Sequence, residues 1–253
     1  PLETIYDTHV EGVCSLDLSP DCTVLVTLSK NAQPQEMKVW NVLNKKTSLS
    51  FSVKLSSKQH QVAFNPDDPS VIITTGLRGV MFHRRQDDGT FTSVSATNEI
   101  ETKADEFLTS SAFLPNTSSA ISGTTEGNII LWDGRSDDEV RTSTKKVKVS
   151  DTSILTLGIV NSYIVVGTED GGVRFFDLRF RLEAYFEDLN AGPVTSISFS
   201  DLVQDEKQTT SLQVPEFVIG TKRALVVLAN AKMFEEYFFF FSYSTLFTLF
   251  TLS

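Results

Sequence analysis

The chain has 253 residues, of which 40% are hydrophobic and 21% are charged. This composition is that of a globular protein with enough chain for a substantial core. The 32 acidic and 22 basic residues give a formal charge of −10, which argues against binding to nucleic acid or an anionic membrane without a local basic patch. The basic clusters are short and lie near acids, so we interpret them as solvated strand edges or turns: Lys45-Lys46, Arg84-Arg85, and Lys145-Lys146 with Lys148.

The chain contains two cysteines, Cys14 and Cys22. No secretory signal opens the sequence, so a disulfide framework is not expected. We therefore expect both cysteines to be buried, reduced thiols in a cytosolic setting. The first residue is Pro1 rather than Met, which suggests an excerpt or an incomplete gene product.

The first strands in the chain predict a set of four. Residues 2–6 indicate a lone strand ahead of this set. Cys14, Leu16 and Leu18 then alternate with polar residues, which is typical of a half-buried strand, and Pro20-Asp21 predicts a turn. Three further strands are expected at residues 24–26, 38–41 and 49–53.

The same pattern of four strands recurs along the chain. The second set is expected at 61–66, 71–76, 80–83 and 91–96, and the third at 108–115, 119–123, 128–133 and 140–149. The fourth set is expected at 154–159, 163–167, 173–177 and 182–186, and the fifth begins with 194–199, 217–220 and 224–228. Gly76, Gly123, Gly167 and Gly220 end the second strands, where a residue without Cβ can leave a strand sharply.

Two series of positions support a repeat. The third-strand aromatic residues Trp40, Phe82, Trp132 and Phe176 are spaced by 42, 50 and 44 residues. The first-strand apolar residues Leu18, Phe64, Phe113, Ile159 and Phe199 are spaced by 46, 49, 46 and 40 residues. Repeats of this length with four strands each are typical of propeller blades, in which each sheet buries both faces against its neighbours. An ordinary β-sandwich is the alternative.

The sequence therefore predicts an all-β fold, a WD40-type β-propeller with about five four-stranded blades, which is incomplete. We place this partial propeller at residues 1–232. The blades are expected at about 9–55, 56–100, 104–150, 151–190 and 191–232. No stretch predicts a long amphipathic helix.

Particular motifs resemble the WD40 repeat. These are His9 to Val13 followed by Ser19-Pro20 and Trp40, and the segment Gly123 to Asp133. In WD40 blades a His, a Ser or Thr, an Asp and the Trp often form a buried hydrogen-bond network, which would make His9 a corner residue of its blade. Only Trp132-Asp133 keeps the dipeptide, so the resemblance implies a divergent propeller held mainly by apolar packing.

A narrower resemblance covers about residues 12–228. Segments 34–40, 127–133, 162–167, 173–177, 192–200 and 217–221 are similar to the cilia- and flagella-associated WD40 proteins of the calmodulin- and spoke-associated complex, at the base of the radial spokes. The resemblance implies a non-enzymatic scaffold of the ciliary or flagellar axoneme that docks a radial spoke to the doublet microtubule and supports motility. It implies as partners the other subunits of this complex and radial spoke proteins, with calmodulin contacted indirectly because no basic amphipathic helix is present. Two alternatives stay open: a WD40 adaptor of another cytosolic complex, and a propeller hydrolase.

No catalytic, cofactor-binding or metal-binding residues are predicted. His9, His60 and His83 lie in different blades without metal-ligand spacing, and we expect His60 and His83 to be exposed. No phosphate-binding loop or nucleophile elbow is present. The acidic pairs Asp67-Asp68, Asp87-Asp88 and Asp137-Asp138 lack the spacing of a calcium loop and indicate solvated turns.

The atypical Phe-rich tail at 233–253 differs in character, and its last 16 residues carry no charge. A membrane helix needs roughly 20 apolar residues, and this stretch is short and interrupted by Ser and Thr, so no membrane contact is expected. A pair of strands completing the fifth blade is a second interpretation. We favour a non-native end, such as a mispredicted exon or a read-through segment.

Overall fold

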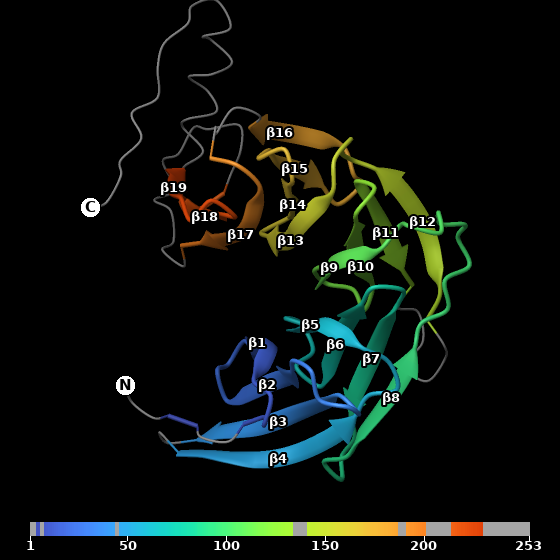
Figure 1. Ribbon diagram of the computed structural model, residues 1–253, viewed down its shortest axis with the longest axis vertical. Helices are drawn as coiled ribbons and strands as arrows, with labels where there is room; N and C mark the ends of the chain where they lie inside the picture. Colours follow the sequence, from blue (N-terminus) through green and yellow to red (C-terminus); the bar gives the residue numbers. More distant parts are fainter. Residues whose placement is uncertain are drawn as a thin grey trace, which may run out of the picture. The chain divides into compact units, whose positions relative to one another are not determined.

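The computed structural model describes residues 4–5, 8–43, 46–133, 141–186, 191–200 and 214–229. In these ranges the secondary structure consists of β-strands, which form five antiparallel sheets with strands in sequence order (Figure 1). Four sheets have four strands, and the fifth has three within the described residues. The chain divides into two compact units, Pro1–Val149 and Ser150–Ser253, and each is described by itself.

Unit 1 contains sheets 1, 2 and 3. Sheet 1 consists of β1 (Val13–Leu18), β2 (Val24–Ser29), β3 (Glu36–Leu43) and β4 (Lys46–Lys54). Sheet 2 consists of β5 (Gln59–Phe64), β6 (Val71–Gly76), β7 (Val80–Arg85) and β8 (Phe91–Ser95). Sheet 3 consists of β9 (Leu108–Phe113), β10 (Ala120–Thr124), β11 (Asn128–Trp132) and β12 (Ser143–Lys148).

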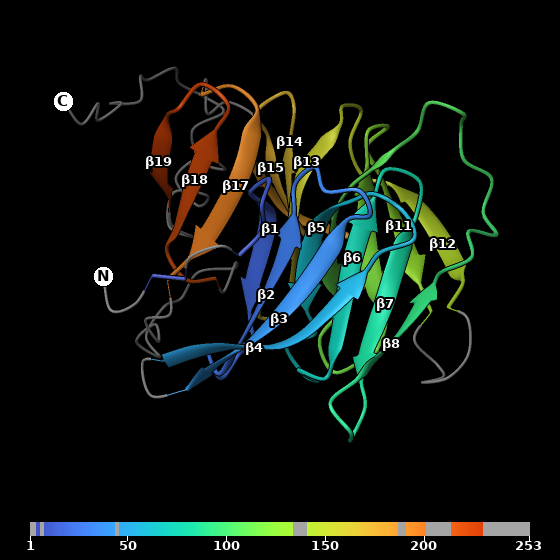
Figure 2. The ribbon, with the colours of Figure 1, turned by 60° about the horizontal axis from the view of Figure 1, so that its bottom comes forward.

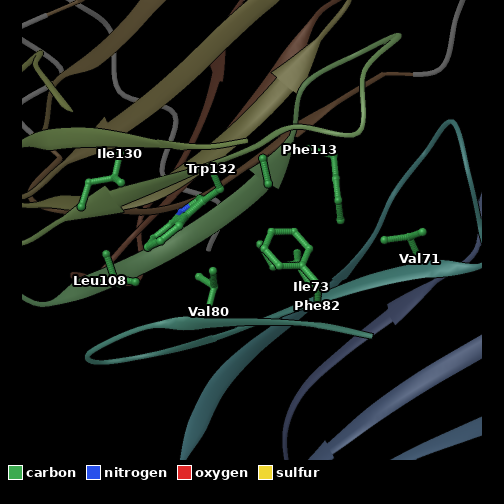
Figure 3. Close-up of a cluster of buried hydrophobic side chains, with 9 residues drawn as sticks. Val71, Ile73, Val80, Phe82, Leu108, Phe113, Ile130 and Trp132 are labelled. Carbon is green, nitrogen blue, oxygen red and sulfur yellow. The ribbon is translucent and has the colours of Figure 1, made fainter. Parts of the chain in front are cut away.

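The three sheets of unit 1 pack face to face, with β1, β5 and β9 at one edge (Figures 1 and 2). Val26 and Leu28 of sheet 1 pack against Phe64 of sheet 2. Between sheets 2 and 3, the rings of Phe82 and Phe113 meet edge to face with centroids 6.1 Å apart (Figure 3). The facing sides of two neighbouring sheets are apolar because each side covers the other and removes it from water.

Polar side chains also join the first strands of neighbouring sheets. The Ser15 hydroxyl accepts a hydrogen bond from Val62 N at 3.1 Å, and the Asp17 carboxylate accepts one from Phe64 N at 2.8 Å. Gln61 bonds both backbone groups of Ser111, whose N–H donates to Gln61 Oε1 at 2.6 Å. These bonds satisfy N–H groups of β5 and β9 that point away from their own sheets.

Unit 2 contains sheets 4 and 5. Sheet 4 consists of β13 (Ile154–Val160), β14 (Tyr163–Thr168), β15 (Val173–Asp177) and β16 (Leu182–Phe186). Sheet 5 consists of β17 (Val194–Phe199), β18 (Phe217–Thr221) and β19 (Val226–Ala229). The two sheets share one apolar cluster, in which Phe175 of sheet 4 meets Phe217 of sheet 5 edge to face at 5.6 Å.

Two glycines serve a different purpose from the one predicted. Gly167 and Gly220 lie inside their strands rather than at sharp exits. A Cβ at Gly167 would lie 2.5 Å from Val194 Cγ1, and one at Gly220 would lie 2.4 Å from Ser196 Oγ. Gly167 therefore lacks room for a Cβ because the Val194 side chain of sheet 5 and the Thr156 side chain of β13 approach it closely, whereas at Gly220 the close atom is the hydroxyl of Ser196, which can rotate.

The strand pairings confirm the predicted first-strand series. Each member lies opposite an equivalent residue of the second strand: Leu18 opposite Leu25, Phe64 opposite Ile72, Phe113 opposite Ala120, Ile159 opposite Ile164, and Phe199 opposite Phe217. Each of these second-strand residues also pairs with a residue of the third strand. In chain order the third-strand residues are Trp40, His83, Trp132, Phe176 and Ala229. The prediction of Phe82 was therefore wrong by one residue, because β7 presents Phe82 to sheet 3 and His83 to the other face.

The prediction of buried cysteines was wrong. Cys14 and Cys22 are both free and exposed. Cys14 lies on the same side of β1 as Leu16 and Leu18, so this strand directs its apolar residues outward and its polar Ser15 and Asp17 toward sheet 2. Cys22 lies in the turn between β1 and β2, where its φ is 57°.

Several predictions fall outside the described residues. These concern most of the lone strand at 2–6, the pair Asp137-Asp138, and the tail at 233–253.

Candidate functional site

His9 is confirmed as the corner residue of sheet 1. The Thr27 hydroxyl accepts a hydrogen bond from Trp40 Nε1 at 2.9 Å and lies 3.0 Å from His9 Nε2. All three side chains are buried, so the hydroxyl satisfies the indole N–H and can donate its own proton to the imidazole. Burial, reinforced by the Lys38 ammonium, lowers the pKa of His9. This arrangement of His, Thr and Trp is the one that the WD40 resemblance implies, with Asn41 in place of the aspartate of the Trp-Asp dipeptide.

Sheet 2 carries a variant of this network. His83 takes the register position of Trp40, and its Nε2 lies 3.0 Å from Thr74 Oγ1, while its Nδ1 lies 2.8 Å from Ser93 Oγ. His83 is fully buried, so the prediction of an exposed side chain was wrong. Burial lowers the pKa of His83 to about 4, so the ring is neutral at physiological pH.

Sheet 3 keeps the tryptophan and replaces threonine with serine. Trp132 Nε1 donates to Ser122 Oγ at 2.8 Å, and Ser122 Oγ lies 2.6 Å from Ser111 Oγ. Thr75 of sheet 2 donates to the same Ser111 hydroxyl at 2.8 Å. The network therefore joins two sheets through buried hydroxyl groups.

A buried acidic centre lies beside the strand ends of sheet 3. Glu106 accepts hydrogen bonds from Thr124 Oγ1 at 2.9 Å, Asn128 Nδ2 at 2.7 Å and Lys146 Nζ at 2.6 Å. Burial by itself would raise the pKa of Glu106, but the bonds from Lys146, Asn128 and Thr124 outweigh it and lower the pKa. The carboxylate is therefore ionised and fully coordinated, as a structural charge pair requires.

An exposed patch lies at the strand ends of sheets 2 and 3. Leu77 and Arg78, in the turn between β6 and β7, are exposed, and the Arg78 guanidinium lies 4.5 Å from the centroid of the Phe107 ring. Leu108 N donates to Leu77 O at 2.9 Å, and Phe107 N donates to Thr125 Oγ1 at 3.0 Å, so the backbone under the patch is held on both sides. We call Leu77, Arg78 and Phe107 the Arg78 patch.

The remaining candidate residues have structural environments. His60 is half-buried rather than exposed, and its Nε2 lies 2.9 Å from Thr109 O. Asp68 and Asp88 cap turns by accepting from the backbone N–H groups of Ser70 and Thr90. In the ranges that the structure describes, no three His, Cys, Asp or Glu side chains are grouped so that they could hold a metal ion. The same ranges contain no helix long and apolar enough to span a membrane.

Sequence reasoning missed most of the polar network residues. Thr27 and Ser122 could have been found, because each lies opposite the residue two positions before the tryptophan of the next strand. Glu106 carried no such signal, since its partner Lys146 is 40 residues away and reaches it only through the pairing of β12 with β11.

Solved structures match the chain as a β-propeller. The β-propeller domain of Cps50 (Swd1) from Myceliophteria thermophila matches 88% of the chain and 71% of its own length, with a TM-score of 0.68 and 14% identity. Sqt1 from Saccharomyces cerevisiae matches 90% of the chain and 62% of its own length, with a TM-score of 0.64 and 13% identity. The predicted all-β propeller fold is thereby confirmed, with five sheets visible as blades.

Two curated relatives share a name. Cilia- and flagella-associated protein 251 of Chlamydomonas reinhardtii is 30% identical over 94% of the chain and 33% of its own length. The protein of the same name from Tetrahymena thermophila is 29% identical over 93% of the chain and 28% of its own length. The chain thus spans about a third of the length of these relatives. The family model described as the CFAP251 N-terminal domain matches residues 1–234, and the chain therefore belongs to the CFAP251 family.

Proposed function

We propose that the chain is a non-enzymatic scaffold of the ciliary or flagellar axoneme. The observation that carries this proposal is the match to the CFAP251 N-terminal domain over residues 1–234, together with relatives named as cilia- and flagella-associated proteins. A propeller of packed sheets suits a scaffold, because its strand-end loops and outer edges are rigidly held and differ from blade to blade.

In finer detail, the scaffold belongs to the calmodulin- and spoke-associated complex and docks a radial spoke to the doublet microtubule, so that it supports motility. This detail rests on the sequence resemblance to WD40 proteins of that complex. Its partners are the other subunits of the complex and radial spoke proteins, and calmodulin acts through another subunit.

The Arg78 patch is the surface at which we place a protein contact. Arg and aromatic side chains are enriched in the energetically dominant parts of interfaces, and exposed apolar residues mark such sites. Here an arginine lies over a phenylalanine ring beside an exposed leucine, on a backbone fixed by two hydrogen bonds.

Imaging tests the axonemal part of the proposal. The tagged protein is expected to line the axoneme, and deletion of the gene is expected to remove a spoke or abolish the beat, as seen by cryo-electron tomography and motility assays. A diffuse cytosolic signal, with normal spokes and normal motility after deletion, would instead support an adaptor of another complex.

A pair of charge reversals tests the patch. Arg78→Glu is expected to disperse the axonemal signal. Arg85→Glu is the matched control, since Arg85 is exposed on the same sheet, where β7 ends, and the same charge is reversed. The patch is excluded if both variants line the axoneme as the unmodified protein does.

A further inference from the structure

A tight turn joins β15 to β16 in sheet 4. Asp177 N donates to Arg181 O at 2.9 Å, and Phe180 N donates to Asp177 O at 2.9 Å, so these bonds close a loop of three residues, 178–180. The last residue of the loop, Phe180, is half-buried and has a φ of 67°. A hairpin loop of this kind usually has glycine at that position, because a residue with a Cβ is disfavoured in the left-handed region.

The turn between β7 and β8 in sheet 2 has the same two hydrogen bonds. Gln86 N donates to Thr90 O at 2.8 Å, and Gly89 N donates to Gln86 O at 2.9 Å. Gly89 has a φ of 84°, so the left-handed position is filled by the expected residue. The two loops therefore correspond residue by residue, and sheet 4 keeps a bulkier residue in the same conformation at a backbone cost.

The corresponding loops carry side chains of opposite character. Sheet 2 has Asp87-Asp88-Gly89 followed by Thr90, whereas sheet 4 has Leu178-Arg179-Phe180 followed by Arg181 and Leu182. Leu178 and Leu182 are 37% and 50% exposed, Arg179 is exposed, and the Arg181 side chain is 67% exposed. We call Leu178, Arg179, Arg181 and Leu182 the sheet 4 tip. In a chain with a net charge of −10, this tip presents two arginines between two exposed leucines.

The Asp177 carboxylate holds the tip in shape. Its Oδ1 accepts hydrogen bonds from Arg179 N at 2.9 Å and from Arg181 N at 2.8 Å, and its Oδ2 accepts one from Arg181 Nε at 2.7 Å. The bond from Arg181 N, together with the Arg181 guanidinium, lowers the pKa of Asp177, so this group is charged. Asp177 thus offsets one arginine, and no acid among the described residues pairs with Arg179. The tip therefore offers a positive charge on a backbone that is already ordered.

We propose that the sheet 4 tip is a second contact site, and that its occupant is an acidic segment of a partner protein that also carries a large apolar side chain. Carboxylates of the segment pair with Arg179 and Arg181, and its apolar side chain lies against Leu178 or Leu182. Charge complementarity carries this choice of partner, because the tip is positive on a chain whose net charge repels other acidic molecules. Arginine also binds carboxylates through two parallel hydrogen bonds and is enriched among the residues that dominate interface energies. The proposal does not depend on an axonemal role.

Binding of synthetic polymers to the purified 253-residue chain tests the proposal. The main probe is a fluorescently labelled copolymer of glutamate and tyrosine, and its affinity is measured by fluorescence anisotropy at low salt, where charge pairs are least screened. Polyglutamate is the comparison probe without apolar side chains, and polyuridylate is the nucleic acid probe. The copolymer is expected to bind more tightly than either of them.

Two variants of the tip and one matched control complete the test. Arg179→Asp introduces the residue that sheet 2 has at this place and is expected to weaken copolymer binding by about tenfold. Arg85→Asp makes the same charge change at an exposed arginine beside the corresponding turn of sheet 2, and it should change the affinity by less than about twofold. Leu178→Ser with Leu182→Thr leaves the charge unchanged and is expected to weaken copolymer binding by about fivefold without a comparable effect on polyglutamate. Unchanged melting temperatures show that the variants are folded.

Several results would overturn the proposal. Absence of copolymer binding would do so, as would equal losses in Arg179→Asp and Arg85→Asp, because the binding would then follow overall charge. Equal affinities for polyglutamate and the copolymer would mean that the leucines add nothing. Tighter binding of polyuridylate would mean that the occupant is a nucleic acid rather than a protein segment.

Discussion

Trp40 of β3 and His83 of β7 occupy the same place in their two sheets. Trp40 pairs with Leu25 and His83 pairs with Ile72, which are equivalent residues of the second strands. Trp40 bonds the hydroxyl of Thr27, and His83 bonds the hydroxyl of Thr74. A neutral imidazole therefore serves in sheet 2 where an indole serves in sheet 1. The polar networks tolerate this change because each ring presents a nitrogen to the buried threonine hydroxyl at the equivalent place in its own sheet.

The buried His83 is expected to make stability depend on pH. Its pKa is about 4 in the folded protein and 6.5 when exposed, so the unfolded chain takes up the proton first as the pH falls. Stability is thus retained above pH 6.5 and lost between pH 6.5 and 4, by at most about 3 kcal/mol. Urea unfolding across this range measures the slope. His83→Gln should flatten it, and an equal slope in the variant would assign the effect to another group.

Thr27 is expected to be coupled to Trp40. Thr27→Val keeps the shape but leaves the buried indole N–H without its acceptor, which costs about 2 kcal/mol. Sheet 4 carries the apolar solution at the same two positions, with Val166 and Phe176. In a double-mutant cycle, adding Trp40→Phe to Thr27→Val should cost about 1 kcal/mol less than the sum of the two single changes. Strict additivity would show that the hydrogen bond contributes nothing to stability.

The Glu106–Lys146 pair is expected to respond strongly to loss of one partner. Lys146→Met leaves a buried carboxylate without its cation, at a cost of about 3 kcal/mol. Adding Glu106→Gln should recover part of that loss, because the neutral amide needs no counter-charge. Lys103→Met is the control, since it removes the cation of the exposed pair with Glu126 and should leave the melting temperature unchanged. Equal losses in the two lysine variants would contradict a special role for burial.

Two glycines of sheet 4 provide a matched pair. Gly167→Ala would place a Cβ 2.5 Å from Val194 and 2.6 Å from Thr156, so we expect a loss of about 2 kcal/mol or more. Gly158→Ala meets no atom within 4 Å and should change the free energy of unfolding by less than about 0.5 kcal/mol. Thermal and urea unfolding of both variants decide between close approach and simple strand propensity as the reason for Gly167.

The strands of sheets 1 to 4 could be predicted from the sequence, whereas the direction of the side chains in β7 could not. Alternation and turn residues located the strands of sheets 1 to 4, because these signals are local and the repeat supplies several copies of each. The choice of Phe82 over His83 failed because both residues are buried in the same strand, and composition cannot tell which face of a strand meets which neighbour.

The sequence by itself determined the fold class, the number of visible sheets and the first-strand register, since these depend on residues close together in the chain and on a repeat of regular length. Only the tertiary structure decided that Cys14, Leu16 and Leu18 lie outward, that His83 is buried, and that Glu106 meets Lys146. The reason is physical: whether a strand face is covered depends on sheets that lie against it in space, and a buried charge or imidazole depends on partners tens of residues away.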